Sequence, residues 1–164
     1  MTPPASDQLS GEGIDDCMLP APQVVGTYWR RLAGEGGGVP RYDDVNLMDL
    51  YKVAHLISVK DVIKGGEDFA YRFWGSELRR ALGFEGTGKL VSQYEPENMR
   101  ARLLDTYRGI VETHEPVLRR GSMRHVYHRM DVTYEVIHVP FKAPESEEIS
   151  QIMSAVEFDV PLTY

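Results

Sequence analysis

The sequence predicts an α+β fold with one five-stranded antiparallel sheet and flanking helices. The length of 164 residues and the 42% content of hydrophobic residues fit a single globular domain. Segments with a strand pattern come as two and then three, and segments with a helical pattern separate the two groups. Two strands, a helical crossover and three strands form one antiparallel sheet, with helices covering one face. The order differs from the βαβ alternation of parallel nucleotide-binding sheets.

Residues 1–22 differ in composition from the rest of the chain. They hold four of the 25 acidic residues and four of the ten prolines, but no Lys or Arg. We therefore expect a disordered, acidic and Pro-rich tail over 1–22 and a folded domain over 23–164. The remaining 21 acidic residues face all 18 basic ones, and this balance gives no general attraction for nucleic acid or anionic lipid.

An amphipathic helix is predicted directly after this tail. Apolar residues recur at intervals of three and four, Arg30 and Arg31 lie off their stripe, and the glycine-rich residues 34–38 end the helix. We expect the stripe to mediate a homodimer with Trp29 as its main anchor, because a large apolar side chain suits the centre of an interface. The stripe consists of Val25, Tyr28, Trp29 and Leu32.

A β-hairpin is predicted next, after one or two helical turns at 46–51. Residues 55–62 are rich in β-branched side chains, and Gly65 and Gly66 allow a tight reversal. The returning strand, 69–74, alternates in a way that puts its aromatic side chains on one face.

Two helices and three strands complete the predicted order. Ser76 can cap a short helix that ends at Gly83, and one apolar stripe predicts a longer helix over 97–112. Pro116 ends the helical region. The three strands after it are predicted at 117–128, 132–141 and 149–158.

Several short motifs occur in a characteristic order between residues 28 and 159. They are 28–32 (YWRRL), 40–41 (PR), 68–76 (DFAYRFWGS), Gly83, 86–88 (GTG), 107–113 (YRGIVET), 116–117 (PV), 134–135 (YE), 140–141 (PF) and 157–159 (EFD). Together, their order and spacing resemble a bacterial subfamily of PAS domains. The chain departs from that subfamily at Ala70, where an Arg is usual, and at Trp74, where a small branched residue is usual. Any ligand can therefore differ from that of the subfamily.

The resemblance implies a curved, helix-flanked sheet that can hold a small ligand and binds a partner through its outer face or N-terminal helix. PAS domains usually sense and relay signals. The chain ends five residues after Asp159, where a multidomain PAS protein would continue into an output module. We therefore expect a stand-alone sensory or regulatory domain of bacterial signalling. It would act by ligand-tuned or constitutive protein–protein contact, or serve as a rigid scaffold without a ligand.

The aromatic strand and the long helix are expected to meet. Their side chains line either a ligand cavity or a filled core, since apolar stripes normally pack. Residues from later strands join them if the strand register holds. The candidates are Tyr71, Phe73, Met99, Leu103, Tyr107, Tyr134, Val136 and Met153.

A haem- or flavin-binding PAS sensor is one alternative, and the cofactor is left open. His114, at the end of the long helix, is the candidate haem ligand, although a helix-terminal His is more often solvated. A flavin adduct needs a core cysteine, whereas the single Cys17 falls in the expected tail. His125 and His128 lie three apart in a predicted strand and would point to opposite faces, so we expect no metal site.

A nucleotide- or nucleic-acid-binding patch is the other alternative. The stretch between Glu115 and Asp131 contains no acid, and its arginines could receive a phosphate or an acidic partner surface. They could equally form the polar side of a strand. These arginines are Arg119, Arg120, Arg124 and Arg129.

The sequence lacks motifs of catalysis and of membrane insertion. It contains no nucleophile elbow and no phosphate-binding glycine loop before a helix, so we expect no enzyme activity and no catalytic residues. No apolar run reaches the roughly 18 residues of a membrane span, and residues 1–22 lack the pattern of a signal peptide. With one cysteine that cannot pair internally, a cytoplasmic location is expected.

Overall fold

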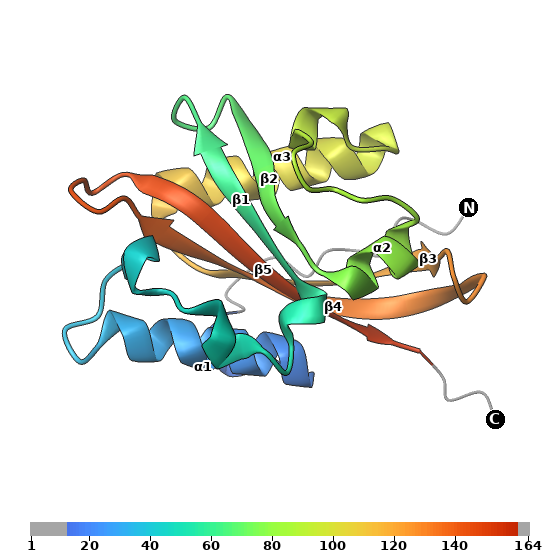
Figure 1. Ribbon diagram of the computed structural model, residues 1–164, viewed down its shortest axis with the longest axis horizontal. Helices are drawn as coiled ribbons and strands as arrows, with labels where there is room; N and C mark the ends of the chain where they lie inside the picture. Colours follow the sequence, from blue (N-terminus) through green and yellow to red (C-terminus); the bar gives the residue numbers. More distant parts are fainter. Residues whose placement is uncertain (1–12, 161–164) are drawn as a thin grey trace.

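A computed structural model describes residues 13–160 of the chain (Figure 1). The helices and strands are α1 (Pro20–Ala33), β1 (Ile57–Ile63), β2 (Asp68–Trp74), α2 (Ser76–Leu82), α3 (Glu97–Thr113), β3 (Val117–His125), β4 (Met130–Lys142) and β5 (Ile149–Asp159). Short 3₁₀ turns lie at Ile14–Asp16, Tyr42–Asp44, Leu47–Leu50, Ala54–Leu56 and Val91–Gln93. The strands form one antiparallel sheet in the order β2-β1-β5-β4-β3, which confirms the predicted α+β class. None of the helices within 13–160 is long and apolar enough to cross a membrane.

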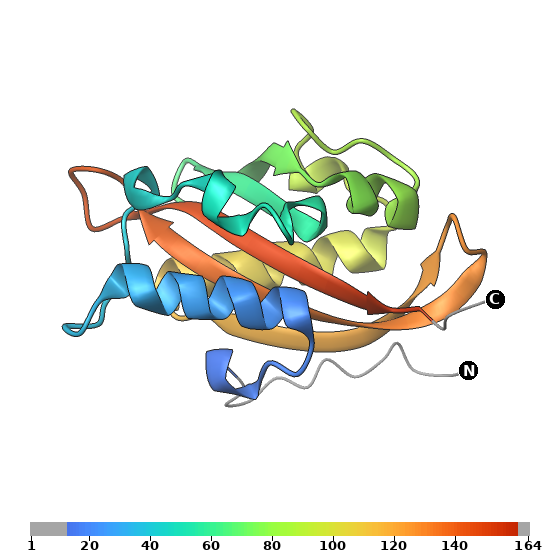
Figure 2. The ribbon, with the colours of Figure 1, turned by 60° about the horizontal axis from the view of Figure 1, so that its bottom comes forward.

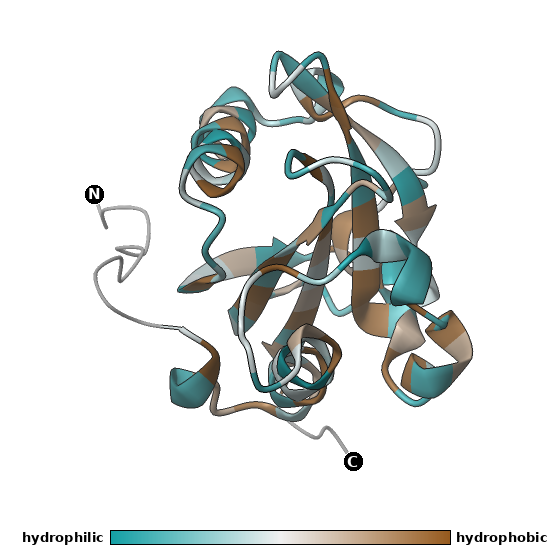
Figure 3. Cartoon of the chain, turned by 90° about the vertical axis from the view of Figure 1, so that its left-hand side faces the viewer, coloured by the Kyte–Doolittle hydropathy of each residue, from teal (hydrophilic) through white to brown (hydrophobic). Residues whose placement is uncertain are grey.

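Helices cover both faces of the sheet, whereas the sequence analysis expected them on one. Helix α1 lies across β4 and β5 on the face that we call the outer face, and α3 runs on the opposite, inner face (Figure 2). Two separate groups of buried apolar side chains result, one beneath α1 and one between the sheet, α2 and α3. The central strands between them are largely hydrophobic, and α3 turns its hydrophobic side toward them (Figure 3).

The β1–β2 hairpin is present as predicted, but a β-bulge changes which side chains share a face. Val59 pairs with Phe73, and the next residue of β1, Lys60, pairs with Tyr71. Arg72 is therefore the extra residue, and Phe73 and Tyr71 point to opposite faces. Phe73 joins the group beneath α1, and Tyr71 joins the group beneath α3.

Helix α3 is fastened to the sheet near its C-terminal end. Tyr107 and Ile110 are buried there, and the Arg108 guanidinium donates hydrogen bonds of 2.9 Å to the carbonyl oxygens of Gly66 and Glu67 in the hairpin turn. Gly66 has φ of 113°, a conformation that a side chain would strain. The N-terminal half of α3 is less deeply buried.

The folded part of the chain begins before the predicted boundary at Gln23. Ile14–Asp16 forms a 3₁₀ turn, Cys17 is buried beneath α1, and α1 itself begins at Pro20, because proline is well suited to the first turn of a helix. The predicted tail therefore does not extend to residue 22. Its first twelve residues lie outside the described part of the chain.

Two glutamates of the sheet hold the start of α1. Glu135 is 2% exposed and accepts hydrogen bonds of 2.9 Å from the amides of Met18 and Leu19 and from Arg120 Nε. Glu157, its cross-strand neighbour, accepts one from the amide of Ala21. The unpaired amides at a helix start attract negative charge, so these carboxylates stabilise α1 on the sheet.

The apolar stripe of α1 packs on the chain's own sheet. Val25, Tyr28 and Trp29 are buried, and Trp29 Nε1 donates a 2.6 Å hydrogen bond to the carbonyl oxygen of Pro140 in β4. Leu32 packs against the same group. A homodimer anchored by this stripe, as predicted from the sequence, would therefore require α1 to leave the sheet.

Replacing Trp29 with alanine should destabilise the fold. The substitution empties a buried site and leaves the Pro140 carbonyl without its donor, which should lower the free energy of unfolding by about 3–5 kcal/mol. Urea unfolding measures the loss. Val24→Ala, at an exposed position of the same helix, is the control and should change stability by less than about 0.5 kcal/mol. Equal stability of the two variants would contradict the packing of α1 described above.

Candidate ligand-binding site

A cavity of about 470 Å³ lies between the inner face of the sheet, α2 and the less buried half of α3. Volumes of this size are typical of small-molecule sites. Of the predicted lining residues, the structure places Tyr71, Met99, Leu103, Tyr107, Tyr134 and Val136 in the wall.

Phe73 and Met153 were also predicted to line the cavity, but they lie in the group beneath α1. The bulge at Arg72 turns Phe73 away from the inner face. In β5, Ser154 faces the cavity, so strand alternation points the preceding Met153 to the outer face.

Aromatic side chains form one end of the cavity. Trp74 contacts Tyr71 and Phe84, with ring centroids 4.9 and 5.1 Å apart, and its Nε1 donates a 3.0 Å hydrogen bond to the carbonyl oxygen of Phe84. Gly86 lies against the Trp74 ring so closely that an added Cβ would be 2.5 Å from a ring carbon. Trp74 is therefore held in one position, where it forms part of the cavity wall.

A row of polar side chains crosses the middle of the inner face. Ser58 of β1 pairs with Ser154 of β5, which pairs with His138 of β4, and all three line the cavity. We call these three residues the polar row. His138 Nδ1 is within hydrogen-bond distance of Ser154 Oγ. Polar side chains at the centre of a sheet interrupt an otherwise apolar floor, so they mark the part of the cavity that can recognise a polar group.

A lysine lies directly behind the polar row. Lys60 is fully buried, and its Nζ donates hydrogen bonds to the hydroxyls of Ser58 and Ser154. The amine also lies 4.8 Å from the centre of the Tyr107 ring. Burial lowers the pKa of Lys60 well below its usual value, because no carboxylate among the described residues balances its charge.

The two other titratable groups beside the polar row also favour their neutral forms. Burial, followed by the charges of Lys60 and Arg119, lowers the pKa of His138 well below its usual value. Burial raises the pKa of the Tyr107 hydroxyl, and the hydroxyl of Ser154 partly offsets this shift by hydrogen bonding. His138 in the polar row and Lys60 behind it are therefore basic groups that favour their neutral forms.

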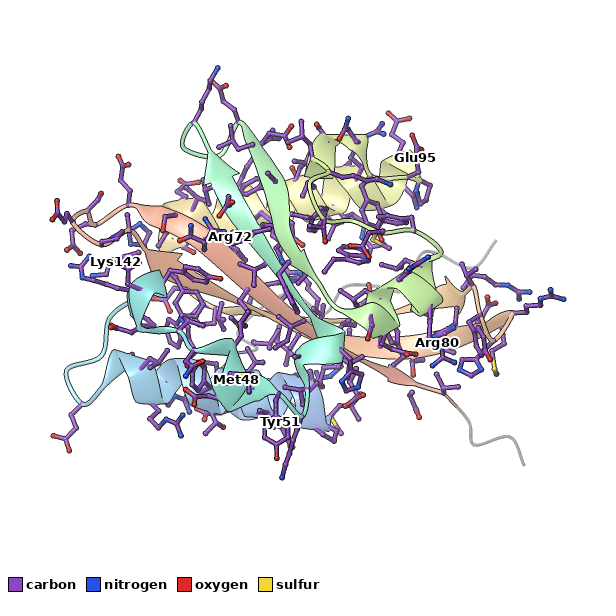
Figure 4. All side chains as sticks on the ribbon, in the orientation of Figure 1. Met48, Tyr51, Arg72, Arg80, Glu95 and Lys142 are labelled. Atoms are coloured by element: carbon purple, nitrogen blue, oxygen red, sulfur yellow. The ribbon has the colours of Figure 1, made fainter. Side chains whose placement is uncertain are left out.

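Positive charge predominates along the cavity wall. Arg102, Arg119 and Arg124 contribute to the lining, and Glu95 is the single acidic residue among the described lining residues. Glu95 is highly exposed, points outward at the rim and lies 3.6 Å from a nitrogen of Arg100 (Figure 4). An anion entering the cavity would meet a favourable field.

The arginines of the predicted basic patch do not form one surface. Arg119 faces the cavity, whereas Arg120 faces outward and pairs with Glu135 at 2.9 Å. Arg124 is 64% exposed and lies 3.9 Å from Asp131, and Arg129 follows in the β3–β4 turn with φ of 54°. Strand alternation separates the first two side chains, so the patch expected from their spacing is divided between two faces.

The residues considered for haem and flavin lie away from the cavity. His114 ends α3 in a left-handed conformation and is absent from the lining, and Cys17 is buried on the outer side of the sheet. Burial, chiefly, raises the pKa of the Cys17 thiol to about 11, so the thiol is unreactive.

His125 and His128 approach each other, contrary to the sequence analysis. Strand β3 ends at His125, and a turn brings the two rings to a centroid distance of 4.5 Å. His125 Nε2 also lies 3.6 Å from Glu77 Oε1. Within residues 13–160, no group of three or more His, Cys, Asp or Glu residues could hold a metal ion.

Comparisons with known proteins give matches among solved structures alone; no protein-family model and no curated protein sequence matches the chain. A Drosophila melanogaster Cycle PAS-B domain is 18% identical and covers 62% of this chain and 97% of its own, with a TM-score of 0.45. A fungal LOV-domain photoreceptor is 12% identical and covers 82% and 90%, with a TM-score of 0.44. A sensory box histidine kinase/response regulator from Burkholderia thailandensis is 9% identical and covers 70% and 85%, with a TM-score of 0.42. At these levels of similarity, no property of these proteins is transferred to this chain.

Lys60→Met should change how stability depends on pH. Between the lowered pKa of the folded state and the usual value near 10.5, the unfolded chain carries a proton on Lys60 that the folded chain lacks. Raising the pH within this interval therefore favours the folded state, by at most about 1.4 kcal/mol per pH unit. Chemical unfolding between pH 7 and 8.5 should show a steeper rise for the wild type than for Lys60→Met.

Lys52→Met is the matched control, because Lys52 is exposed and the chemical change is the same. Its pH dependence should follow that of the wild type. If Lys60→Met also followed the wild type, the folded protein would hold Lys60 in its charged form.

Proposed function

We propose that this chain is a PAS-type sensory domain that binds a small molecule in the cavity and relays its presence by contact with a protein partner. The proposal is carried by one observation: a cavity of about 470 Å³ with aromatic walls has a polar row at the centre of its floor and a buried amine directly behind that row. A filled core would not leave such groups beside a void, because buried polar groups without a ligand add a desolvation cost. The motifs that resemble PAS domains support the same function.

Strand β4 connects the cavity to the outer face. Tyr134 and Val136 line the cavity, and Glu135 between them holds the start of α1 on the other side. A ligand that shifts this part of β4 would change the seat of α1. We propose α1 and the outer face as the surface that responds, in a cytoplasmic bacterial signalling pathway. A homodimer would be formed by an α1 that has moved from the sheet.

Filling the cavity should prevent ligand capture. Leu103→Trp adds bulk to a lining residue of α3, and Asp105→Trp makes a similar addition at an exposed position of the same helix. Native mass spectrometry of protein from its own source should show a bound small molecule in the wild type and in Asp105→Trp, and none in Leu103→Trp. No bound molecule in the wild type, together with no thermal shift across a metabolite panel, would refute the sensor function.

Weakening the link at β4 should loosen α1. Glu135→Gln removes the charge that accepts from two backbone amides and from Arg120. We expect hydrogen exchange of the amides of Met18, Leu19, Ala21 and Gln23 to be about 5–30-fold faster, which corresponds to about 1–2 kcal/mol. Glu148→Gln, at an exposed position beyond β4, is the control. Unchanged exchange in Glu135→Gln would show that Glu135 does not hold the helix.

A further inference from the structure

The charges around the cavity select one class of ligand. We propose that the cavity binds an organic acid, an inference that rests on the proposed function. The ligand has an aromatic or branched apolar body and one carboxylate, and the carboxylate is directed at the polar row. The aromatic walls receive the body of the ligand, Arg119 adds positive charge to the lining, and Lys60 and His138 can each take up a proton when the carboxylate binds.

The balance of charged groups excludes the opposite ligand class. His138 lies at the floor with Lys60 directly behind it, and three arginines contribute to the wall, whereas Glu95 at the rim is the one acidic residue of the described lining. Arg124 also lies 3.9 Å from the exposed Asp131, outside the lining. A cationic ligand would be repelled by the arginines, and it would further disfavour protonation of Lys60 and His138. A neutral ligand of the same shape would fill the space but would leave Lys60 and His138 in their neutral forms, so it would gain no ion pair with them.

The hydrogen-bond capacity of the polar row fits a carboxylate. A serine hydroxyl has one hydrogen to donate and can accept two. The hydroxyls of Ser58 and Ser154 each accept from Lys60 Nζ. Ser58 therefore has its own hydrogen left to donate to a ligand, whereas Ser154 also meets His138 Nδ1 and the Tyr107 hydroxyl. Donors that face a cavity and are backed by an amine suit an acceptor-only group, and an ionised carboxylate is acceptor-only.

The walls define the apolar part of the ligand. Rings of Tyr71, Trp74, Phe84 and Tyr94 follow one another at centroid distances of 4.9, 5.1 and 5.4 Å along one end of the cavity. Met99 and Leu103 of α3 lie in the same lining. Aromatic surfaces in this arrangement suit a flat ring system or a branched chain, since they offer ring faces and edges for packing.

Binding of an acid should also take up protons. The pKa values of Lys60 and His138 are lowered because their charged forms are buried without a countercharge, and a carboxylate on the polar row would raise both. The other groups that face this point are Tyr71 and Tyr107, whose raised pKa values keep them neutral, and the permanently charged Arg119. Affinity for an acid should therefore be higher at pH 6 than at pH 8.

Three compounds with the same ring system test the inference: 1-naphthylacetate, 1-naphthylacetamide and 2-(1-naphthyl)ethylamine. Titration calorimetry of the full chain at pH 7, in buffers of different ionisation enthalpy, gives affinity and proton uptake. We expect the acid to bind at least tenfold more tightly than the amide and with net proton uptake, and the amine to give no binding. This comparison uses the wild type, so it does not depend on the folding of any variant.

Lys60→Met identifies the group responsible. It should reduce affinity for the acid at least tenfold, change affinity for the amide less than threefold and reduce the proton uptake to the part that His138 contributes. The exposed Lys52→Met should leave all three quantities unchanged. An acid preference that persists in Lys60→Met would overturn the role assigned to the buried amine.

The outcomes separate this inference from the proposed function. Equal affinity for acid and amide, or binding of the amine, overturns the acid specificity but leaves a ligand-binding cavity. Binding of none of the three compounds also overturns it, while native mass spectrometry decides independently whether the cavity captures another molecule.

Discussion

A sheet with two apolar faces must be covered on both, and most of this structure follows from how the two covers are made. Helix α1 covers the outer face closely, because its apolar stripe and the carboxylates of Glu135 and Glu157 hold it against β4 and β5. Helix α3 covers the inner face closely only around Tyr107 and Ile110. Where α3 leaves the sheet, toward its N-terminal end, the cavity opens.

The centre of the inner face contains polar and ionisable side chains, which are rarely buried at the middle of a sheet. Lysine is almost never fully buried, yet Lys60 is, and serine hydroxyls with a neighbouring histidine surround it. Desolvating an amine without a countercharge destabilises the folded state. Stability alone would favour an apolar residue here, so a group of this kind is typical of positions where a fold performs a function.

Most of the fold could be predicted from the sequence, because the order of elements follows from periodicity and turn residues. The hairpin, the long helix and the last three strands were predicted with boundaries within a few residues. The bulge at Arg72 was not predicted, since nothing in an alternating run marks which residue is extra. Phe73 and Tyr71 were placed on one face for that reason.

The site was predicted in its apolar part and missed in its polar part. Stripes on α3 and on the strands identified Met99, Leu103, Tyr107, Tyr134 and Val136, which do line the cavity. Ser58, Lys60 and Ser154 were missed, because a polar residue in a strand usually faces solvent. A charged residue inside a run of β-branched neighbours was the one available signal. The start of the fold was placed too late because the composition of residues 13–22 resembles a tail, although Glu135 and Glu157 hold its last residues on the sheet.

The three consecutive residues of β4 at 134–136 also couple the cavity to the position of α1. Their side chains alternate between the cavity wall and the seat of α1, so one stretch of backbone belongs to both. Thermodynamic linkage is reciprocal: a ligand that alters the hold on α1 must itself be bound more or less tightly when another molecule alters that hold. A partner that draws α1 from the sheet would therefore change the affinity of the cavity for such a ligand.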